Sequence, residues 1–276
     1  MGELASHVEE TVAYLASPAA RDSIRRDPYW PKWDSPWWRM TLLWELGLAD
    51  RIPGAIVDLM VERSDAHYVH FFPTEAGRLP AGKDPRLHVL CQCAAGTLHQ
   101  VLAACGVAVD RELPWLKRLL LDTVLPDGGV NCDDAAYSGS RKSSLVSTLP
   151  ALEAILRAPG AKTEEELAFL DGGAAYLIGR RLVRSSRGEI IDEAWLSRAR
   201  PSFYHYDWER GAAFLRGWAA LRGKPDPVPA LGPAPKAGKR WALESVSLVA
   251  DDGKWRRGSS RTFPLLDAVR ARIGSD

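Results

Sequence analysis

The chain has 276 residues, enough for one large domain, and carries 36 Lys and Arg against 35 Asp and Glu. This balance argues against nucleic acid as the main partner, because phosphate binding requires a net basic surface. No apolar run approaches the ~20 residues of a membrane span, and the acidic start lacks the pattern of a secretory signal, so we expect no membrane span and a cytoplasmic protein with reduced cysteines.

Five amphipathic stretches recur along the chain, each with Leu or Ala every three to four residues after a small or polar start. A common register aligns Leu43 with Leu102 and Leu102 with Leu152. Periods of this length indicate an array of helical hairpins. The expected helix starts lie near Asp34, Cys93, Ser143, His205 and Arg261.

Further apolar helical patterns lie between these stretches, at 111–125 and 163–183, so each unit is expected to hold an inner and an outer helix. The sequence therefore predicts an all-α fold in which residues 1–276 form a single domain of five to six helical hairpins. The Pro- and Gly-rich segment 224–240 predicts an extended connection. After it, 241–249 and 251–255 predict a β-hairpin that turns at an Asp-Gly pair.

Four segments resemble the prenyltransferase and squalene-cyclase repeat superfamily, and the likeness is greatest to its small, single-toroid bacterial members. They are LPDGGVNC at 125–132, SSLVSTLPALEAIL at 143–156, RRLVRSSRGEIIDEAW at 180–195 and FYHYDWERGAAFL at 203–215. The first keeps the Asp-Gly-Gly core of the repeat but has Val130 where Trp is usual. The resemblance implies an α/α toroid, a barrel of inner and outer helices around a central cavity. It also implies a ligand site at the starts of the inner helices, where free N–H groups and the positive dipole end lie.

The segment Asn131–Asp134 resembles the acid motif of triterpene cyclases, with Asn in place of its first Asp. The resemblance implies that Asp133 protonates an alkene, with Asp134, His205 and Asp207 as further catalytic groups. The implied function is that of a terpenoid cyclase- or prenyltransferase-like enzyme acting by acid–base chemistry on a small or hydrophobic substrate. The alternative interpretation is a loop rich in Asn and Asp that caps the next helix.

His205 also resembles the zinc-binding His of protein prenyltransferase β subunits, which likewise begins an inner helix. This likeness implies an alternative function, a zinc-dependent transferase or hydrolase that uses Cys132, Asp133 and His205. Zinc accepts this combination of sulfur, oxygen and nitrogen ligands, and Cys93 is a substitute for Cys132. A capping role or a general-base role for His205 is the competing interpretation.

Several residues at expected helix starts are predicted to bind substrate and to gather at one mouth of the toroid. Asp34 is expected to cap its helix, and Cys93 is a candidate nucleophile because helix starts stabilise thiolates. The third hypothesis is a noncatalytic toroid that binds a ligand or a partner. The predicted substrate-binding residues are Asp34, Trp37, Cys93, Ser144 and Tyr204.

His88, Cys91 and His99 share one face of a predicted helix. Because Leu side chains surround this face in the sequence, we interpret it as packed interior with satisfied polar atoms.

Overall fold

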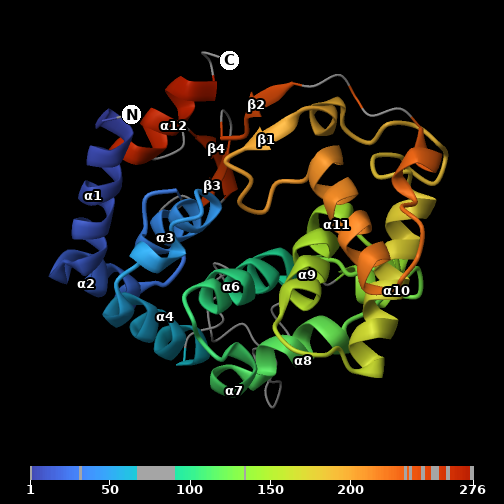
Figure 1. Ribbon diagram of the computed structural model, residues 1–276, viewed down its shortest axis with the longest axis horizontal. Coiled ribbons are helices and arrows are strands. Elements are labelled where there is room, and N and C mark those ends of the chain that lie inside the picture. Colours follow the sequence, from blue (N-terminus) through green and yellow to red (C-terminus); the bar gives the residue numbers. More distant parts are fainter. Residues whose placement is uncertain are drawn as a thin grey trace. The chain divides into compact units, whose positions relative to one another are not determined.

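The computed structural model describes residues 2–30, 33–66, 91–133, 135–232, 235, 238–243, 246–249, 255–258 and 262–273 (Figure 1). These residues are mostly helical with a few short strands, which confirms the all-α prediction. They gather in two compact units. The first unit comprises 1–89, 101–113 and 241–276, and the second comprises 90–100 and 114–240. Closure of helical hairpins into a toroid stays a prediction.

The helices begin where the repeat predicts them. They are α3 (Pro36–Glu45), α6 (Gln92–Ala104), α9 (Leu145–Arg157), α11 (Trp208–Leu221) and α12 (Pro264–Ile273). Side-chain caps explain two of these starts. The Ser144 hydroxyl accepts the backbone N–H of Ser147 at α9, and the Asp207 carboxylate accepts that of Arg210 at α11. Each cap satisfies a backbone donor that the first helical turn leaves without an intrahelical acceptor.

The first unit holds α3, α12 and the last residues of α6. Its other elements are α1 (Gly2–Ala16), α2 (Pro18–Arg26), the 3₁₀ turn η1 (Ala49–Arg51), α4 (Gly54–Ala66), α7 (Val109–Glu112), β3 (Val246–Val249) and β4 (Trp255–Gly258). Helix α1 contacts α2, α3, α4 and α12. An aromatic cluster fills the core beside α3, where the rings of Trp33 and Trp38 lie 4.2 Å apart and the Trp38 indole donates to the Tyr29 carbonyl.

The predicted β-hairpin is confirmed in its pairing. Strands β3 and β4 run antiparallel, with Val246 opposite Gly258 and Val249 opposite Trp255. The Asp-Gly pair expected at the turn lies outside the described residues.

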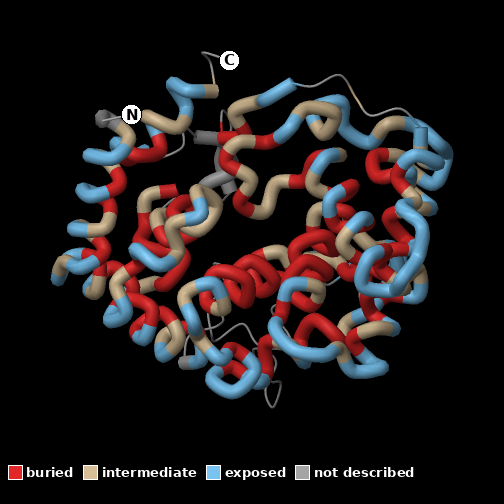
Figure 2. Tube along the Cα trace, viewed as in Figure 1, coloured by how far each residue is buried: buried red, intermediate tan, exposed pale blue. Residues whose placement is uncertain are grey.

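The second unit is built around α9. Its other elements are the first part of α6, α8 (Pro114–Asp122), a turn of π-helix η4 (Ala136–Ser140), α10 (Glu164–Gly179), η5 (Glu193–Leu196), β1 (Arg198–Arg200), α11, η6 (Val228–Leu231) and β2 (Lys239–Trp241). Helix α9 contacts α10 and α11. Every residue from Ser147 to Ile155 is buried, so α9 forms the centre of the unit (Figure 2).

Helix α6 meets α9 backbone to backbone, without an intervening side chain. A Cβ placed on Gly96 would lie 2.4 Å from the Pro150 carbonyl, so only glycine allows this approach. The Gln100 side-chain amide donates to the Pro150 carbonyl across the same contact. The close approach fixes the start of α6 against the start of α9, which positions the site described below.

A buried ion pair joins α9 to α11. Glu153 is 2% exposed, and its carboxylate accepts hydrogen bonds from the Arg210 guanidinium, with the shortest N–O distance 2.5 Å. The same guanidinium donates to the carbonyls of Phe203 and His205. Arg210 therefore anchors the loop that precedes α11.

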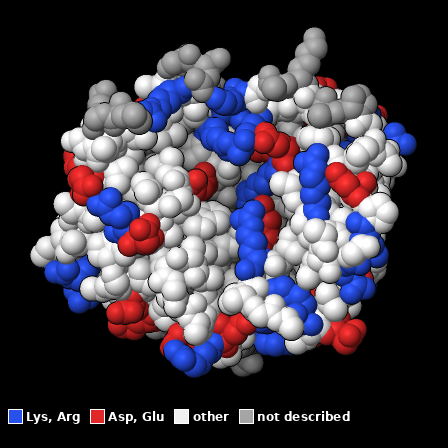
Figure 3. All heavy atoms as spheres, viewed as in Figure 1, with Lys and Arg blue, Asp and Glu red and all other residues white. Residues whose placement is uncertain are grey.

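Charged side chains are mixed on the surface. On the face shown in Figure 3, basic and acidic residues lie interspersed, in agreement with a formal net charge of +1. Among the described residues, no helix combines the length and the apolar character that crossing a bilayer requires.

Candidate functional site: a three-cysteine cluster

Three cysteine sulfurs converge in the second unit at the start of α6. Cys91 directly precedes the helix, Cys93 lies in its first turn, and Cys132 comes from the loop between α8 and η4. The Cys93 sulfur lies 3.5 Å from that of Cys132 and 3.7 Å from that of Cys91. All three sulfurs lie within 4.8 Å of one another, close enough to bind a single ion. We refer to Cys91, Cys93 and Cys132 as the thiol cluster.

A glycine turn brings Cys132 to the cluster. The backbone N–H of Gly128 donates to the Leu125 carbonyl, and Leu125 in turn donates to the carbonyl of Gly129. Gly128 has φ +92°, and a Cβ there would lie 2.4 Å from the Gly172 carbonyl oxygen of α10. The position therefore excludes side chains both by its backbone conformation and by lack of space.

Hydrogen bonds then fasten the loop to the start of α9. The backbone N–H of Val130 donates to the Thr148 hydroxyl, and that of Cys132 donates to the Ser147 hydroxyl at 3.1 Å. The Asp127 carboxylate accepts from both the backbone N–H and the hydroxyl of Ser143. The Asp-Gly-Gly sequence of this loop thus serves to position the cysteine that follows.

The environment of Cys132 favours a thiolate. Hydrogen bonds with the thiols of Cys91 and Cys93 lower the pKa of Cys132 well below its usual value, and the Cys93 backbone N–H contributes to the same shift. The pKa of Cys91 is raised by its hydrogen bonds to Cys132 and Cys93 and by burial. Negative charge in the cluster is therefore favoured on Cys132, whose sulfur accepts the Cys93 N–H at the start of α6.

Tyr204 lies in the loop before α11 and is influenced electrostatically by the cluster. Burial raises the pKa of its hydroxyl, and the charges of Cys93, Cys91 and Cys132 raise it further. The Tyr204 ring stacks on that of His205, with centroids 4.9 Å apart. The hydroxyl therefore remains protonated near neutral pH.

The structure brings part of the predicted site together. Cys93 and Cys132 meet in the thiol cluster, and Ser144 caps the helix whose Ser147 holds Cys132. Tyr204 is related to the cluster only through its electrostatic influence. Among the described residues, the group able to hold a metal contains Cys132 but neither Asp133 nor His205. The predicted zinc set of Cys132, Asp133 and His205 is thus replaced by three cysteines.

Asp133 and Asp207 take local structural positions. Asp133 is exposed, and its carboxylate accepts the backbone N–H of Ala135 in a tight turn. Asp207 is 2% exposed, and its two oxygens accept the backbone N–H groups of Arg210 and Ala199. Both arrangements match the capping interpretation of these carboxylates. Asp134 lies outside the described residues.

Asp34 and Trp37 belong to the first unit. The prediction that Asp34 caps α3 is wrong, because Ser35 occupies the N-cap position and the Asp34 carboxylate instead pairs with Arg39 at 2.7 Å. The Arg39 guanidinium in turn lies over the Tyr14 ring. Trp37 is 1% exposed and packs in the aromatic core, so it contributes to packing.

Cys91 is the member of the site that the sequence reasoning missed. Its place on a helix face with His88 and His99 predicted packed interior. His99 is 2% exposed and fits that interpretation, whereas His88 lies outside the described residues. The Cys-x-Cys spacing of Cys91 and Cys93 was the available signal, because it places two sulfurs at one helix start.

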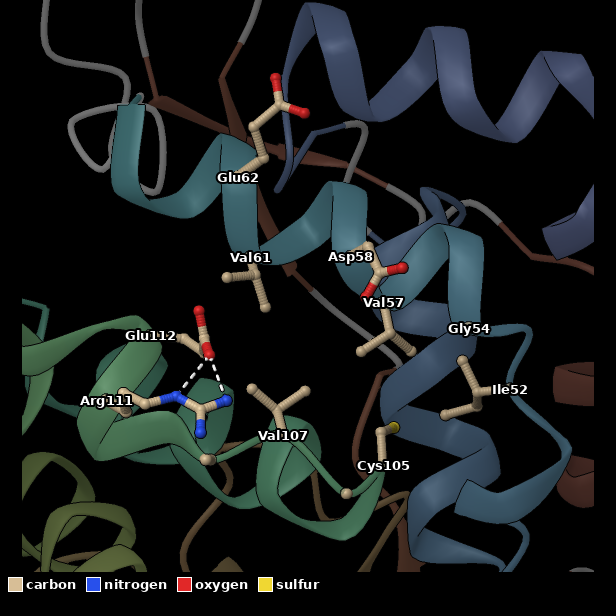
Figure 4. Close-up of a pocket in the computed structure, with 12 residues that line it drawn as sticks. Ile52, Gly54, Val57, Asp58, Val61, Glu62, Cys105, Val107, Arg111 and Glu112 are labelled. Carbon is tan, nitrogen blue, oxygen red and sulfur yellow. Dashed lines mark hydrogen bonds and ion pairs between the residues drawn. The ribbon is translucent and has the colours of Figure 1, made fainter.

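The first unit contains a separate pocket of about 520 Å³ between α4 and residues 105–112 (Figure 4). Val57 and Val61 face Val107 across it, while Arg111 pairs with Glu112 at its edge. Cys105 lines the pocket, and burial raises the pKa of its thiol to about 11. This thiol is therefore protonated near neutral pH and is a poor nucleophile.

No family model, curated protein or solved structure matches this chain. The likeness to the prenyltransferase and squalene-cyclase repeats therefore rests on the sequence segments alone.

Proposed function

We propose that the protein is a zinc-dependent transferase or hydrolase in which Cys91, Cys93 and Cys132 bind the ion. The observation that carries this proposal is the convergence of three sulfurs within 4.8 Å at the start of α6. Thiolates are the ligands that zinc prefers in sulfur-rich sites. The proposal keeps one of the functions expected from the sequence and changes its ligands.

The sulfur separations support a metal site. Zinc–sulfur bonds of about 2.3 Å in tetrahedral geometry place neighbouring sulfurs about 3.8 Å apart. Two of the three separations in the cluster, those from Cys93 to Cys132 and to Cys91, are 3.5 and 3.7 Å, and all three sulfurs lie within 4.8 Å of one another. Binding therefore requires little movement of Cys93 relative to its two neighbours.

The surroundings also support binding. Three thiolates around a divalent cation leave one net negative charge, and the Cys93 N–H at the positive end of α6 compensates part of it. The loop that carries Cys132 is fixed through Ser147, which is the kind of outer support that keeps ligands in place.

A cluster of three protein ligands is compatible with a catalytic zinc site. Catalytic zinc sites keep a coordination position for water or substrate, whereas structural sites fill all four with protein ligands. Within the described part of the chain, the cluster has three such residues.

The hypothesis of an acid–base cyclase receives less support. A carboxylic acid stays protonated at neutral pH when burial raises its pKa. Asp133 is exposed and accepts a backbone hydrogen bond in its turn. The geometry of the site therefore favours the zinc-dependent hypothesis over the cyclase hypothesis.

The first test is metal content. The protein is purified under reducing conditions, loaded with zinc, freed of excess ion by gel filtration and analysed by mass spectrometry of the metal. We expect about one zinc per chain in the wild type and in Cys105→Ser, the matched control. Cys91→Ser, Cys93→Ser and Cys132→Ser should each lose most of the bound zinc. A wild-type chain that retains no zinc after loading would contradict the proposal.

The second test asks whether a coordination position is open. Cobalt replaces zinc, and its visible absorption reports coordination. Added azide or a small thiol should shift the spectrum if an exchangeable position exists, and Cys105→Ser should respond like the wild type. A tetrahedral cobalt spectrum that no added ligand changes would identify a closed structural site and favour the noncatalytic hypothesis.

A further inference from the structure

Two members of the thiol cluster differ from the third in access to solvent. Cys93 and Cys132 are partly exposed, whereas Cys91 is 5% exposed. The sulfurs of Cys93 and Cys132 lie 3.5 Å apart, closer than the 3.7 Å between those of Cys93 and Cys91. A small oxidant from solvent therefore has better access to these two residues than to Cys91.

We propose that Cys93 and Cys132 form an oxidisable pair, which hydrogen peroxide converts to a disulfide. The loss of two of its three sulfur ligands then releases the metal, and this second step rests on the proposed function. The oxidation itself requires only the two sulfurs and the peroxide.

The reaction balances with one peroxide per disulfide. The Cys132 sulfur attacks one peroxide oxygen, the O–O bond breaks, and the departing hydroxide takes up the proton that the Cys132 thiol gives up, which makes the first water. The Cys93 sulfur then attacks the resulting sulfenic acid, an S–S bond forms and the S–O bond breaks. The hydroxide that leaves takes the Cys93 proton as a second water, so two sulfurs are oxidised and one peroxide is reduced.

The local backbone permits this closure. A disulfide has sulfurs about 2.05 Å apart, so the pair must approach by about 1.5 Å. Cys93 lies in the first turn of α6, and Cys132 lies at the end of the loop, where its own backbone is fastened to α9 by the bond from its N–H to Ser147. The approach therefore has to come from rotation of the two side chains and a small shift of Cys132, which does not require unwinding a helix.

Cys91 is the less suitable partner for either sulfur. Cys91 is 5% exposed, so a small oxidant from solvent has less access to it than to the other two residues. It lies two residues from Cys93, so a bond between them closes a short loop at the helix start. The structure thus singles out one of three pairings.

The experiment treats the metal-free and the zinc-loaded protein with hydrogen peroxide. Disulfides are mapped by mass spectrometry after alkylation of the remaining thiols, and released zinc is measured with a coloured chelator. We expect a Cys93–Cys132 disulfide in both forms, loss of two alkylatable thiols, release of the bound zinc, and reversal by dithiothreitol.

Variants make the pairing testable. Cys91→Ser and Cys105→Ser should still form the disulfide in the metal-free protein, whereas Cys93→Ser and Cys93→Ala should not. Circular dichroism melting curves identify any variant that fails to fold, and the wild-type map then decides the pairing by itself.

The outcomes separate the two proposals. A wild-type disulfide that joins Cys91 to either neighbour overturns the inference, as does peroxide that leaves Cys93 and Cys132 reduced or oxidises Cys132 only to the sulfinic acid. A Cys93–Cys132 disulfide in a chain that never binds zinc upholds the oxidisable pair and refutes the metal site. A chain that binds zinc but keeps Cys93 and Cys132 reduced in peroxide upholds the metal site and refutes the oxidisable pair.

Discussion

The backbone N–H of Cys93 donates to the sulfur of Cys132 at 3.5 Å, although 39 positions separate the two residues in the sequence. This contact joins the N-terminus of α6 to the glycine turn after α8. It makes the geometry of the thiol cluster depend on the turn, which leads to the first prediction.

Gly128→Ala should destabilise the protein and weaken zinc binding. The new methyl group would lie 2.4 Å from the Gly172 carbonyl oxygen, and the position has φ +92°. The backbone strain costs about 1–2 kcal/mol, and forcing space for the methyl adds about 1–3 kcal/mol. Urea unfolding and zinc affinity measure the two effects.

Gly160→Ala is the matched control for this substitution. Gly160 has φ +88°, but nothing lies within 4 Å of its added Cβ. We expect only the strain cost of about 1–2 kcal/mol and unchanged zinc affinity. Equal losses of stability and of zinc affinity in Gly128→Ala and Gly160→Ala would show that the close approach of Gly128 to α10 contributes to neither property.

Asp207→Ala should lower stability, whereas Asp133→Ala should leave it nearly unchanged. Asp207 is buried and caps α11, and loss of such a cap costs about 0.5–2 kcal/mol. Asp133 is exposed, and substitutions at such surface positions stay within about 0.5 kcal/mol. Thermal melting compares the two, and zinc content should stay at the wild-type value in both. Loss of zinc from Asp133→Ala would indicate that the Asp133 carboxylate is a zinc ligand after all.

Arg210→Met should destabilise strongly and disturb the loop that carries Tyr204. Removing one partner of a buried ion pair costs about 3–5 kcal/mol because the other charge stays buried. Glu153, at 2% exposure, is that remaining charge. The double variant Glu153→Gln and Arg210→Met should therefore recover part of the stability lost in Arg210→Met. No recovery in urea unfolding would mean that the bonds to Phe203 and His205 carry the effect.

Cys105 should react slowly with iodoacetamide near neutral pH. Burial raises the pKa of this thiol to about 11, so at pH 8 only about one thousandth is thiolate. The rate, followed by mass spectrometry of the Cys105 peptide, should rise about tenfold per pH unit up to pH ~11. A rate that levels off near pH 9 would show an ordinary thiol.

The sequence predicted the helices well because their signals are local. Apolar periodicity placed the starts of α3, α6, α9 and α11 to within a few residues, and an Asp-Gly pair marked the hairpin of β3 and β4. These features depend on residues close together in the chain.

The site was predicted only in part because it depends on contacts between distant residues. Cys132 reaches Cys93 through the Gly128 turn and its packing against α10, which no local pattern reveals. Asp34 shows the same limit, since both a cap and an ion pair suit an Asp before a helix, and the distant side chains around Arg39 decide between them.

The approach of Gly128 to Gly172 also constrains how this chain can diverge. A Cβ on Gly172 would meet Gly128 at 3.5 Å, an ordinary contact, whereas a Cβ on Gly128 would collide with backbone. Proteins that descend from this chain should therefore accept alanine at position 172 and keep glycine at position 128. Where the three cysteines are lost over time but Gly128 persists, selection acts on the architecture. Where Gly128 and the three cysteines change together, selection acts on the chemistry of the thiol cluster.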